Sequence, residues 1–312
     1  MLSQWLDRGI ERFTQFFPAG TFFNWEFNVR ATLAVVLVSF ACGAVGSLVV
    51  SNRMAFFSDA LAHCAFAGVA LGFLVALAAG VHNAGEFTHW VTPIMVVFGV
   101  GIGLLIAYVR EKTSLANDTV IGVFFAGAIG LGAILLPFVS SRRYFNPENF
   151  LFGDPITVTS ADILLLFALV VVTAVVLGVL YNHLVFTSFN PSLALSRKVR
   201  VRLCNFTFIV LLALIVNLGL QIVGALLINA MLVVPAATGA NLCRNMRQLF
   251  WCTVGICLSV GAAGLGLSWT ITVADSARDG GSRISFGIGG IMVVLSVLLF
   301  FTSMLLGPRL RR

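Results

Sequence analysis

The sequence predicts an all-α membrane protein that crosses the bilayer about nine times. Of its 312 residues, 59% are hydrophobic and only 10% are charged, whereas roughly a quarter of a soluble domain is charged. Apolar runs of about 20 residues recur along the chain, and each is long enough to cross the hydrocarbon core as a helix. Segments that alternate with a period of two, which are typical of a membrane barrel, are not seen.

The first 27 residues are predicted to lie at the membrane surface as an amphipathic segment. They mix aromatic residues such as Trp5, Phe13 and Phe16 with charged residues such as Asp7 and Arg8. This segment lacks the basic start, apolar core and cleavage site of a signal peptide. Residues 28–308 are expected to form one transmembrane domain, and residues 309–312 a basic tail.

Nine spans follow from the apolar windows. They are placed near 29–50, 57–80, 91–109, 119–139, 162–182, 203–219, 222–240, 250–272 and 286–306. The sixth and seventh spans are separated by a tight outer turn expected near Gly219.

The distribution of basic residues predicts the orientation of the chain. The segment 197-RKVRVR-202 holds four basic residues and is therefore assigned to the cytoplasmic side. Alternation of the spans then gives an external N-terminus and a cytoplasmic C-terminus. The predicted cytoplasmic basic residues are Arg53, Arg110, Lys112, Arg197, Lys198, Arg200, Arg202, Arg244, Arg247, Arg309, Arg311 and Arg312. No basic array is interleaved with aromatic residues, so nucleic-acid binding is not expected.

An acid and an imidazole stand at the start of the second span. Asp59 and His63 are four residues apart, so both project from one face of a helix. Carboxylate oxygen and imidazole nitrogen suit Mn²⁺, Fe²⁺ or Zn²⁺. Two ligands hold a metal loosely, as transport requires. The alternatives are an N-cap role for Asp59, with Ser58 competing, and a buried structural role for His63.

Two further features are candidates for function. His82, Glu86 and His89 lie in a predicted outer loop and are interpreted either as a loose metal-collecting vestibule or as ordinary solvated residues. Pro235 interrupts the seventh span and frees backbone carbonyls that neighbours or water must satisfy. It therefore predicts a gate or hinge, or else an ordinary proline kink.

The absence of well-known ATP-binding and hydrolase motifs reduces the number of functions that the sequence can have. The sequence has no G-x-x-x-x-G-K-[ST] loop for ATP, no H-E-x-x-H and no G-x-S-x-G. The chain is therefore not expected to hydrolyse ATP or to act as an intramembrane hydrolase. The six cysteines form no C-x-x-C pair and are interpreted as structural thiols.

Several stretches together resemble the membrane permease subunit of the zinc, manganese and iron ABC importers, the ABC-3 family. They are 58-SDALAHCAFAGVALGF-73, 117-NDTVIGVFFAGAIGLGAILL-136, 151-LFGDPITVTSAD-162, 189-FNPSLALSRKVRVRLCNF-206 and 220-LQIVGALLINAMLVVPAATGANL-242. These stretches follow the order of the family's motifs and cover most of residues 30 to 250.

The resemblance implies a helical fold related to the vitamin B12 type (type II) of ABC permease, in a bacterial plasma membrane. It implies a second permease copy or paralogue, a cytoplasmic ATPase that binds ATP, and an external metal-binding protein. No cofactor would be bound permanently, and the divalent metal would be cargo. Asp59 and His63 would line the metal pathway, with Pro235 and Thr238 at the gate. Within the loop of about residues 186–202, the docking residues would be Phe189, Asn190, Pro191, Ala194, Arg197 and Lys198.

The chain departs from the family pattern in several places. Asn190 stands where aspartate is usual, Ser196 where glycine is usual, and Phe66 with Ala67 where a Leu-Pro pair is common. The outer segment 275–285 is longer and more charged than usual. The ligand types do not distinguish zinc, manganese and iron. Rival functions are an ion-coupled carrier or channel that acts alone, and a membrane metalloenzyme that adds Cys64 to Asp59 and His63.

Overall fold

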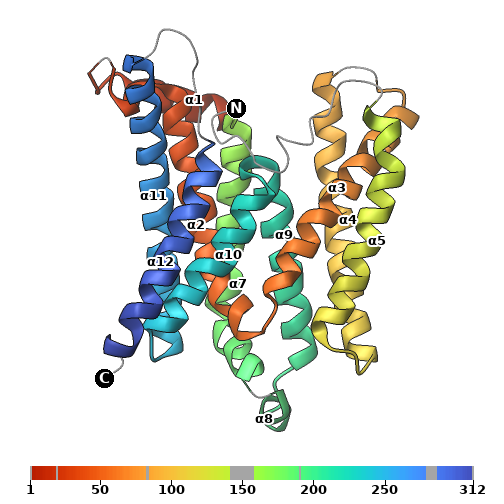
Figure 1. Cartoon of the computed structure of the whole chain (residues 1–312). Helices are drawn as coiled ribbons and strands as arrows, with labels where there is room; N and C mark the ends of the chain where they lie inside the picture. Colours follow the sequence, from red (N-terminus) through yellow and green to blue (C-terminus); the bar gives the residue numbers. More distant parts are fainter. Residues whose placement is uncertain are drawn as a thin grey trace. The chain divides into compact units, whose positions relative to one another are not determined.

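All the regular secondary structure in the computed structural model is helical over the residues that it describes, which are 2–18, 20–81, 84–140, 158–189, 191–278 and 287–310 (Figure 1). In chain order the helices are α1 (Leu2–Thr14), the 3-10 helix η1 (Phe22–Asn24), α2 (Glu26–Ser51), α3 (Ala55–Ala78), α4 (Ala84–Lys112), α5 (Asn117–Ser140), α7 (Ser160–Phe189), α8 (Pro191–Ser196), α9 (Val201–Val223), α10 (Ala225–Leu242), α11 (Met246–Arg278) and α12 (Ile288–Leu310).

Nine helices in this described part are long and apolar enough to cross a membrane, which confirms the expected number. They are α2, α3, α4 from Trp90 onward, α5, α7, α9, α10, α11 and α12. The prediction of a turn near Gly219 is wrong, because Gly219 lies within α9. The two helices are instead separated at Gly224, between the end of α9 and the start of α10. Gly224 has a φ of 88°, a conformation that glycine adopts without a steric penalty.

The chain divides into two compact units. Unit 1 contains Met1–Ser47, Leu151–Val175 and Gln221–Arg312, and unit 2 contains Leu48–Phe150 and Val176–Leu220. Unit 1 therefore holds α1, most of α2, the first half of α7, and α10 to α12. Unit 2 holds α3, α4, α5, the second half of α7, α8 and most of α9.

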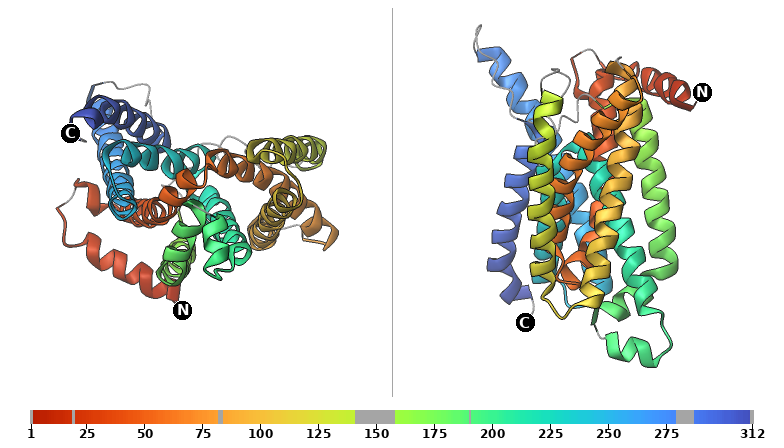
Figure 2. Two further views of the ribbon diagram at one scale, coloured as in Figure 1. Left: turned by 90° about the horizontal axis from the view of Figure 1, so that it is seen from below. Right: turned by 90° about the vertical axis from the view of Figure 1, so that its right-hand side faces the viewer.

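In unit 2, α3 packs against both α4 and α5 (Figures 1 and 2). Small residues on α3 permit the close approach to α4. A Cβ atom added to Gly72 would lie 3.0 Å from the Cα of Val91, and one added to Gly68 would lie 3.2 Å from the Cα of Met95. Close backbone packing of this kind holds membrane helices together, since lipid supplies no hydrophobic drive between them.

Unit 1 is packed around α10. This helix contacts α11 and α12. It also lies close to α2, because a Cβ atom added to Gly46 of α2 would be only 2.6 Å from the backbone oxygen of Leu232 in α10. On the same helix α2, a Cβ on Gly43 would lie 2.8 Å from the Cα of Val254 in α11. The two glycines therefore let α2 approach both helices closely.

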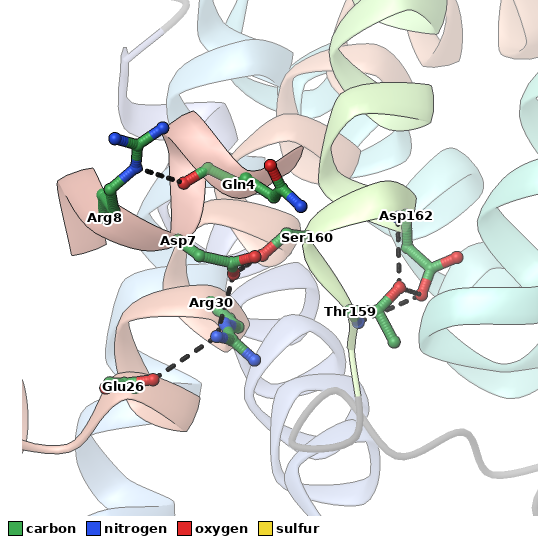
Figure 3. Close-up of polar contacts among 8 residues, drawn as sticks. All are labelled: Gln4, Asp7, Arg8, Glu26, Arg30, Thr159, Ser160 and Asp162. Carbon is green, nitrogen blue, oxygen red and sulfur yellow. Dashed lines mark hydrogen bonds and ion pairs between the residues drawn. The ribbon is translucent and has the colours of Figure 1, made fainter. Parts of the chain in front are cut away.

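The N-terminal segment contains the helix α1. Its Asp7 carboxylate accepts hydrogen bonds from Arg30 of α2, at 3.0 Å, and from the hydroxyl of Ser160 in α7 (Figure 3). Trp5 and Phe16 are exposed, at 67% and 86%. The polar side thus ties α1 to two membrane helices, whereas the aromatic residues are left for the membrane surface. That location itself stays a prediction.

Three connections meet at one end of unit 2. The Nε of Arg110, at the end of α4, donates to Asn117 Oδ1 at the start of α5 at 2.9 Å, and its Nη1 donates to the sulfur of Met54 in the α2–α3 turn at 3.3 Å. Arg202 of α9 lies 2.9 Å from Glu111. Seven of the twelve basic residues assigned to the cytoplasm lie in or beside these connections, so within unit 2 their meeting agrees with the predicted orientation.

Candidate functional site

The position at which α3 begins decides whether Asp59 is the N-cap of this helix. The helix begins at Ala55 with Met54 at the N-cap position, and no side chain caps it. Ser58 instead donates its hydroxyl to the carbonyl of Ala55 at 3.1 Å. Asp59 therefore lies in the second helical turn, where its carboxylate is not a cap, and the N-cap interpretation of Asp59 is wrong.

Asp59 and His63 lie together on one face of α3, as their spacing predicts. The Nδ1 atom of His63 lies 2.9 Å from the backbone oxygen of Asp59 and 3.7 Å from its carboxylate oxygen Oδ1. A carbonyl oxygen can only accept a hydrogen bond, so Nδ1 carries the proton in this contact. In the neutral ring the lone pair is then on Nε2, which is the form that binds a metal.

The surroundings of the pair leave it partly open. The side chains of Asp59 and His63 are 44% and 32% exposed, although their neighbours Ala60, Leu61 and Ala62 are buried. The ring of His63 meets the ring of Phe125 from α5 edge to face, with the centroids 4.8 Å apart. His63 is therefore held in place without being a fully buried structural histidine.

Cys64 does not share this open face. It is completely buried, although it follows His63 directly in the sequence. Its thiol is thus withheld from a metal held by Asp59 and His63, which counts against the metalloenzyme that would use all three residues. Among the described residues, no group of three or more histidine, cysteine, aspartate or glutamate side chains is arranged to hold a metal ion. Asp59 and His63 are two candidate ligands, and their role in holding a metal stays a prediction.

The predicted vestibule is only partly within the described structure. His82 lies outside the described residues. Glu86 and His89 belong to α4, which begins at Ala84, so the expected outer loop is helical over this stretch. Their side chains are not among those described, and the vestibule stays a prediction.

The predicted docking segment forms a short helix, as its Asn-Pro start suggests. Phe189 is the last residue of α7, Asn190 lies outside the described residues, and Pro191 begins α8. Ala194 is fully buried, whereas Phe189, Leu193 and Leu195 are exposed. Helix α8 thus buries its small residue Ala194 and leaves large apolar side chains exposed, and its docking role stays a prediction.

The end of α8 explains where the basic residues Arg197 and Lys198 lie. The amide of Val199 donates to the carbonyl of Ala194, and the amide of Lys198 donates to that of Leu195. This is a Schellman motif with Lys198 at its left-handed position, at a φ of 59°. The motif ends α8 abruptly and places both basic side chains at the exposed turn before α9.

Pro235 lies inside α10, which continues through it instead of breaking. The ring removes the amide proton that would bond to the carbonyl of Met231, four residues earlier. That carbonyl accepts a hydrogen bond from the thiol of Cys257 in α11 at 3.4 Å. Thr238 donates its hydroxyl to the carbonyl of Val234 at 2.8 Å. The freed carbonyl is therefore satisfied by a neighbour, one of the two outcomes expected.

Two of these contributions are not predicted by the sequence. Cys257 had no detectable signal, because its pairing with Met231 depends on how α10 and α11 pack. The sequence indicates Arg110 only as a cytoplasmic charge, although Arg110 joins the α2–α3 and α4–α5 turns. Its position just before the end of an apolar span was the available signal.

The chain is similar to a known family of transport proteins and to individual membrane proteins. A model of the ABC 3 transport family matches residues 24–307. The chain is 30% identical over 273 residues to the membrane protein slr2045 of Synechocystis, a match that covers 86% of this chain and 92% of that protein. It is 28% identical over 289 residues to the manganese import system permease protein ScaB of Streptococcus parasanguinis, covering 93% of this chain and 94% of ScaB.

A solved structure has the same fold. PsaBC from Streptococcus pneumoniae in complex with a Fab contains a chain that matches with a TM-score of 0.74 and 22% identity. The match covers 100% of this chain and 98% of that chain. Similarity at this level of identity establishes the arrangement of the helices, and the residues of α3 must be interpreted from their own geometry.

Proposed function

The chain belongs to the ABC 3 transport family, and on that basis we propose that it is the permease subunit through which an ATP-driven importer passes divalent transition-metal ions. The observation that carries the proposal is the Asp59–His63 pair on the partly open face of α3. Its carboxylate and its imidazole would supply two ligands, an incomplete shell that can accept an ion and release it again.

Manganese is the metal that we propose as cargo. ScaB, which matches over nearly the whole chain, is a manganese import permease. A hard carboxylate oxygen beside an imidazole suits Mn²⁺, although it also accepts Fe²⁺ and Zn²⁺. The partial shell leaves coordination positions that water can fill, as a passing ion requires.

Energy comes from a separate ATPase subunit in this proposal. The sequence has no phosphate-binding loop of its own. Helix α8 offers Leu193 and Leu195 as exposed apolar side chains, with Arg197 and Lys198 directly after them. An amphipathic docking surface of this kind suits a cytoplasmic partner. An external metal-binding protein and a second permease copy complete the proposed importer.

In this proposal, ATP-driven closure of the ATPase tilts the docking segment and the region of Pro235 and Thr238, and access switches from outside to inside. A helix with a proline has one backbone hydrogen bond fewer than a regular helix, so it bends with less resistance. In α10 the missing bond is replaced by a thiol, a weak donor. A weak replacement of this kind suits α10 to the role of a hinge.

Transport in proteoliposomes tests the proposed function. The chain is reconstituted alone, and also together with its ATPase, and entry of radioactive Mn²⁺ is followed with and without ATP. The external metal-binding protein is supplied in every case. We expect uptake only when the ATPase and hydrolysable ATP are both present. Uptake by the chain alone, driven by an ion gradient and indifferent to ATP, would establish the rival carrier.

A further inference from the structure

A charged pocket lies at the end of unit 2 where the three connections meet. Its volume is about 300 Å³, and it is formed by the end of α4, the starts of α5 and α9, and one side chain of α8. Polar groups on its wall come from Arg110, Glu111, Asn117, Arg202 and Asn205. We call it the Arg110 pocket. Neither Asp59 nor His63 lines it.

Arg110 is a partly buried cation whose contacts are with neutral groups. Two of the five N–H donors of its guanidinium are used, by the amide oxygen of Asn117 and the sulfur of Met54. Within the described ranges of the chain, no carboxylate lies at ion-pair distance from it. A guanidinium removed from water in this way favours an anion with oxygen atoms in a plane or fork.

The rest of the pocket adds positive potential. Arg202 lies over the ring of Phe206, with 5.7 Å between its Cζ and the ring centroid, and its Nε faces Glu111 at 2.9 Å. Two arginines against one glutamate leave one positive charge in excess. The helices α5 and α9 both start at the pocket, and the amide groups of a helix start also attract anions.

The pocket is next to apolar surface that faces outward. Tyr108 of α4 and Leu203 of α9 are exposed on the helices that form its walls. This combination matches a phospholipid, whose phosphate is joined to acyl chains. A soluble phosphate has no use for the apolar side chains. The end of unit 2 concerned is the one predicted to face the cytoplasm, where anionic lipids are abundant.

We propose that the Arg110 pocket binds the phosphate group of an anionic phospholipid in the cytoplasmic leaflet. The free N–H groups of Arg110 hold the phosphate oxygens, and Arg202 and Asn205 contact the headgroup from α9. Because Leu195 of α8 is part of the wall, a bound lipid also steadies the helix proposed to receive the ATPase.

Lipid binding to the purified full-length chain tests the assignment. The chain in neutral detergent is titrated with phosphatidylglycerol or with phosphatidylcholine, and bound lipid is counted by native mass spectrometry. We expect preferential retention of phosphatidylglycerol, weakened roughly tenfold by Arg110→Gln because charge-assisted hydrogen bonds are lost. Arg247→Gln is the matched control, since it removes an exposed arginine at the start of α11 and should change nothing.

A variant that is expected to strengthen lipid binding makes the test more specific. Glu111→Gln removes the carboxylate that competes for Arg202, so it should tighten phosphatidylglycerol binding severalfold, whereas Arg202→Gln should weaken it. The side chains of Glu111 and Arg202 are exposed, so their substitution should not prevent folding. These two variants therefore test the proposal if Arg110→Gln does not fold. Equal binding of both lipids, or no response to these substitutions, would overturn the proposal. Displacement of the lipid by an equal concentration of inorganic phosphate would also overturn it, in favour of a soluble anion.

Discussion

The imidazole of His63 presents Nε2 because the helix that carries it occupies Nδ1. The acceptor is the backbone oxygen of Asp59, 2.9 Å away, and Phe125 meets the flat ring edge to face. The spacing of the two residues in the sequence was enough to predict one shared face. It was not enough to predict the tautomer or the open surroundings, because these depend on α5 and on the missing N-cap of α3.

At the same scale, the contact of Cys257 with Met231 gives a prediction about stability. Cys257→Ala leaves the carbonyl of Met231 unpaired, since Pro235 supplies no amide proton. We expect it to lower the free energy of unfolding by about 1 kcal/mol more than Cys42→Ala, a control that removes another fully buried thiol. Thermal unfolding of the purified chain in detergent measures both. Equal losses in the two variants would show that only packing matters.

The sequence predicts some helix ends in this protein and not others. Gly80, with a φ of 79°, ends α3 in a Schellman motif of the kind that a glycine after an apolar run predicts. Arg53 and Lys198 take the same left-handed position after α2 and α8. Nothing in either residue type predicts this, because the hydrogen bonds of the turn outweigh the steric penalty of a side chain.

Glycines within the helices lead to a prediction at the scale of elements. Gly46→Ala would place a Cβ 2.6 Å from the backbone oxygen of Leu232, so α2 and α10 must separate. We expect a loss of about 1–3 kcal/mol in the free energy of unfolding. Gly101→Ala is the control, because nothing lies within 4 Å of the added atom, and it should be neutral or gain up to about 1 kcal/mol. Detergent unfolding compares them, and equal behaviour would contradict the close contact.

At the scale of the whole molecule, hydropathy predicts the spans and little of their grouping. The number of candidate spans follows from apolar length alone. The division into two compact units does not, because α2 and α7 each contribute to both. Which helices pack together depends on small residues meeting particular backbones, as at Gly46 and Gly72. The spacing of Asp59 and His63 nevertheless predicts the face of α3 that they share.

The account of transport requires that Asp59 and His63 act as one unit. A carboxylate and an imidazole a turn apart bind a divalent ion together, and either alone is a weak ligand. Removing both should therefore impair transport little more than removing one. Cys64→Ala, which changes a buried neighbour off this face, should leave transport intact.

The most direct measurement is the flux of Mn²⁺ through the reconstituted importer with Asp59→Asn, His63→Gln or both, together with its rate of ATP hydrolysis. We predict that each variant inserts and assembles, that the basal ATPase rate is kept, and that Mn²⁺ flux falls at least roughly tenfold. Flux at the unmodified rate in the double variant would contradict the account, because the ion would then cross without its two proposed ligands.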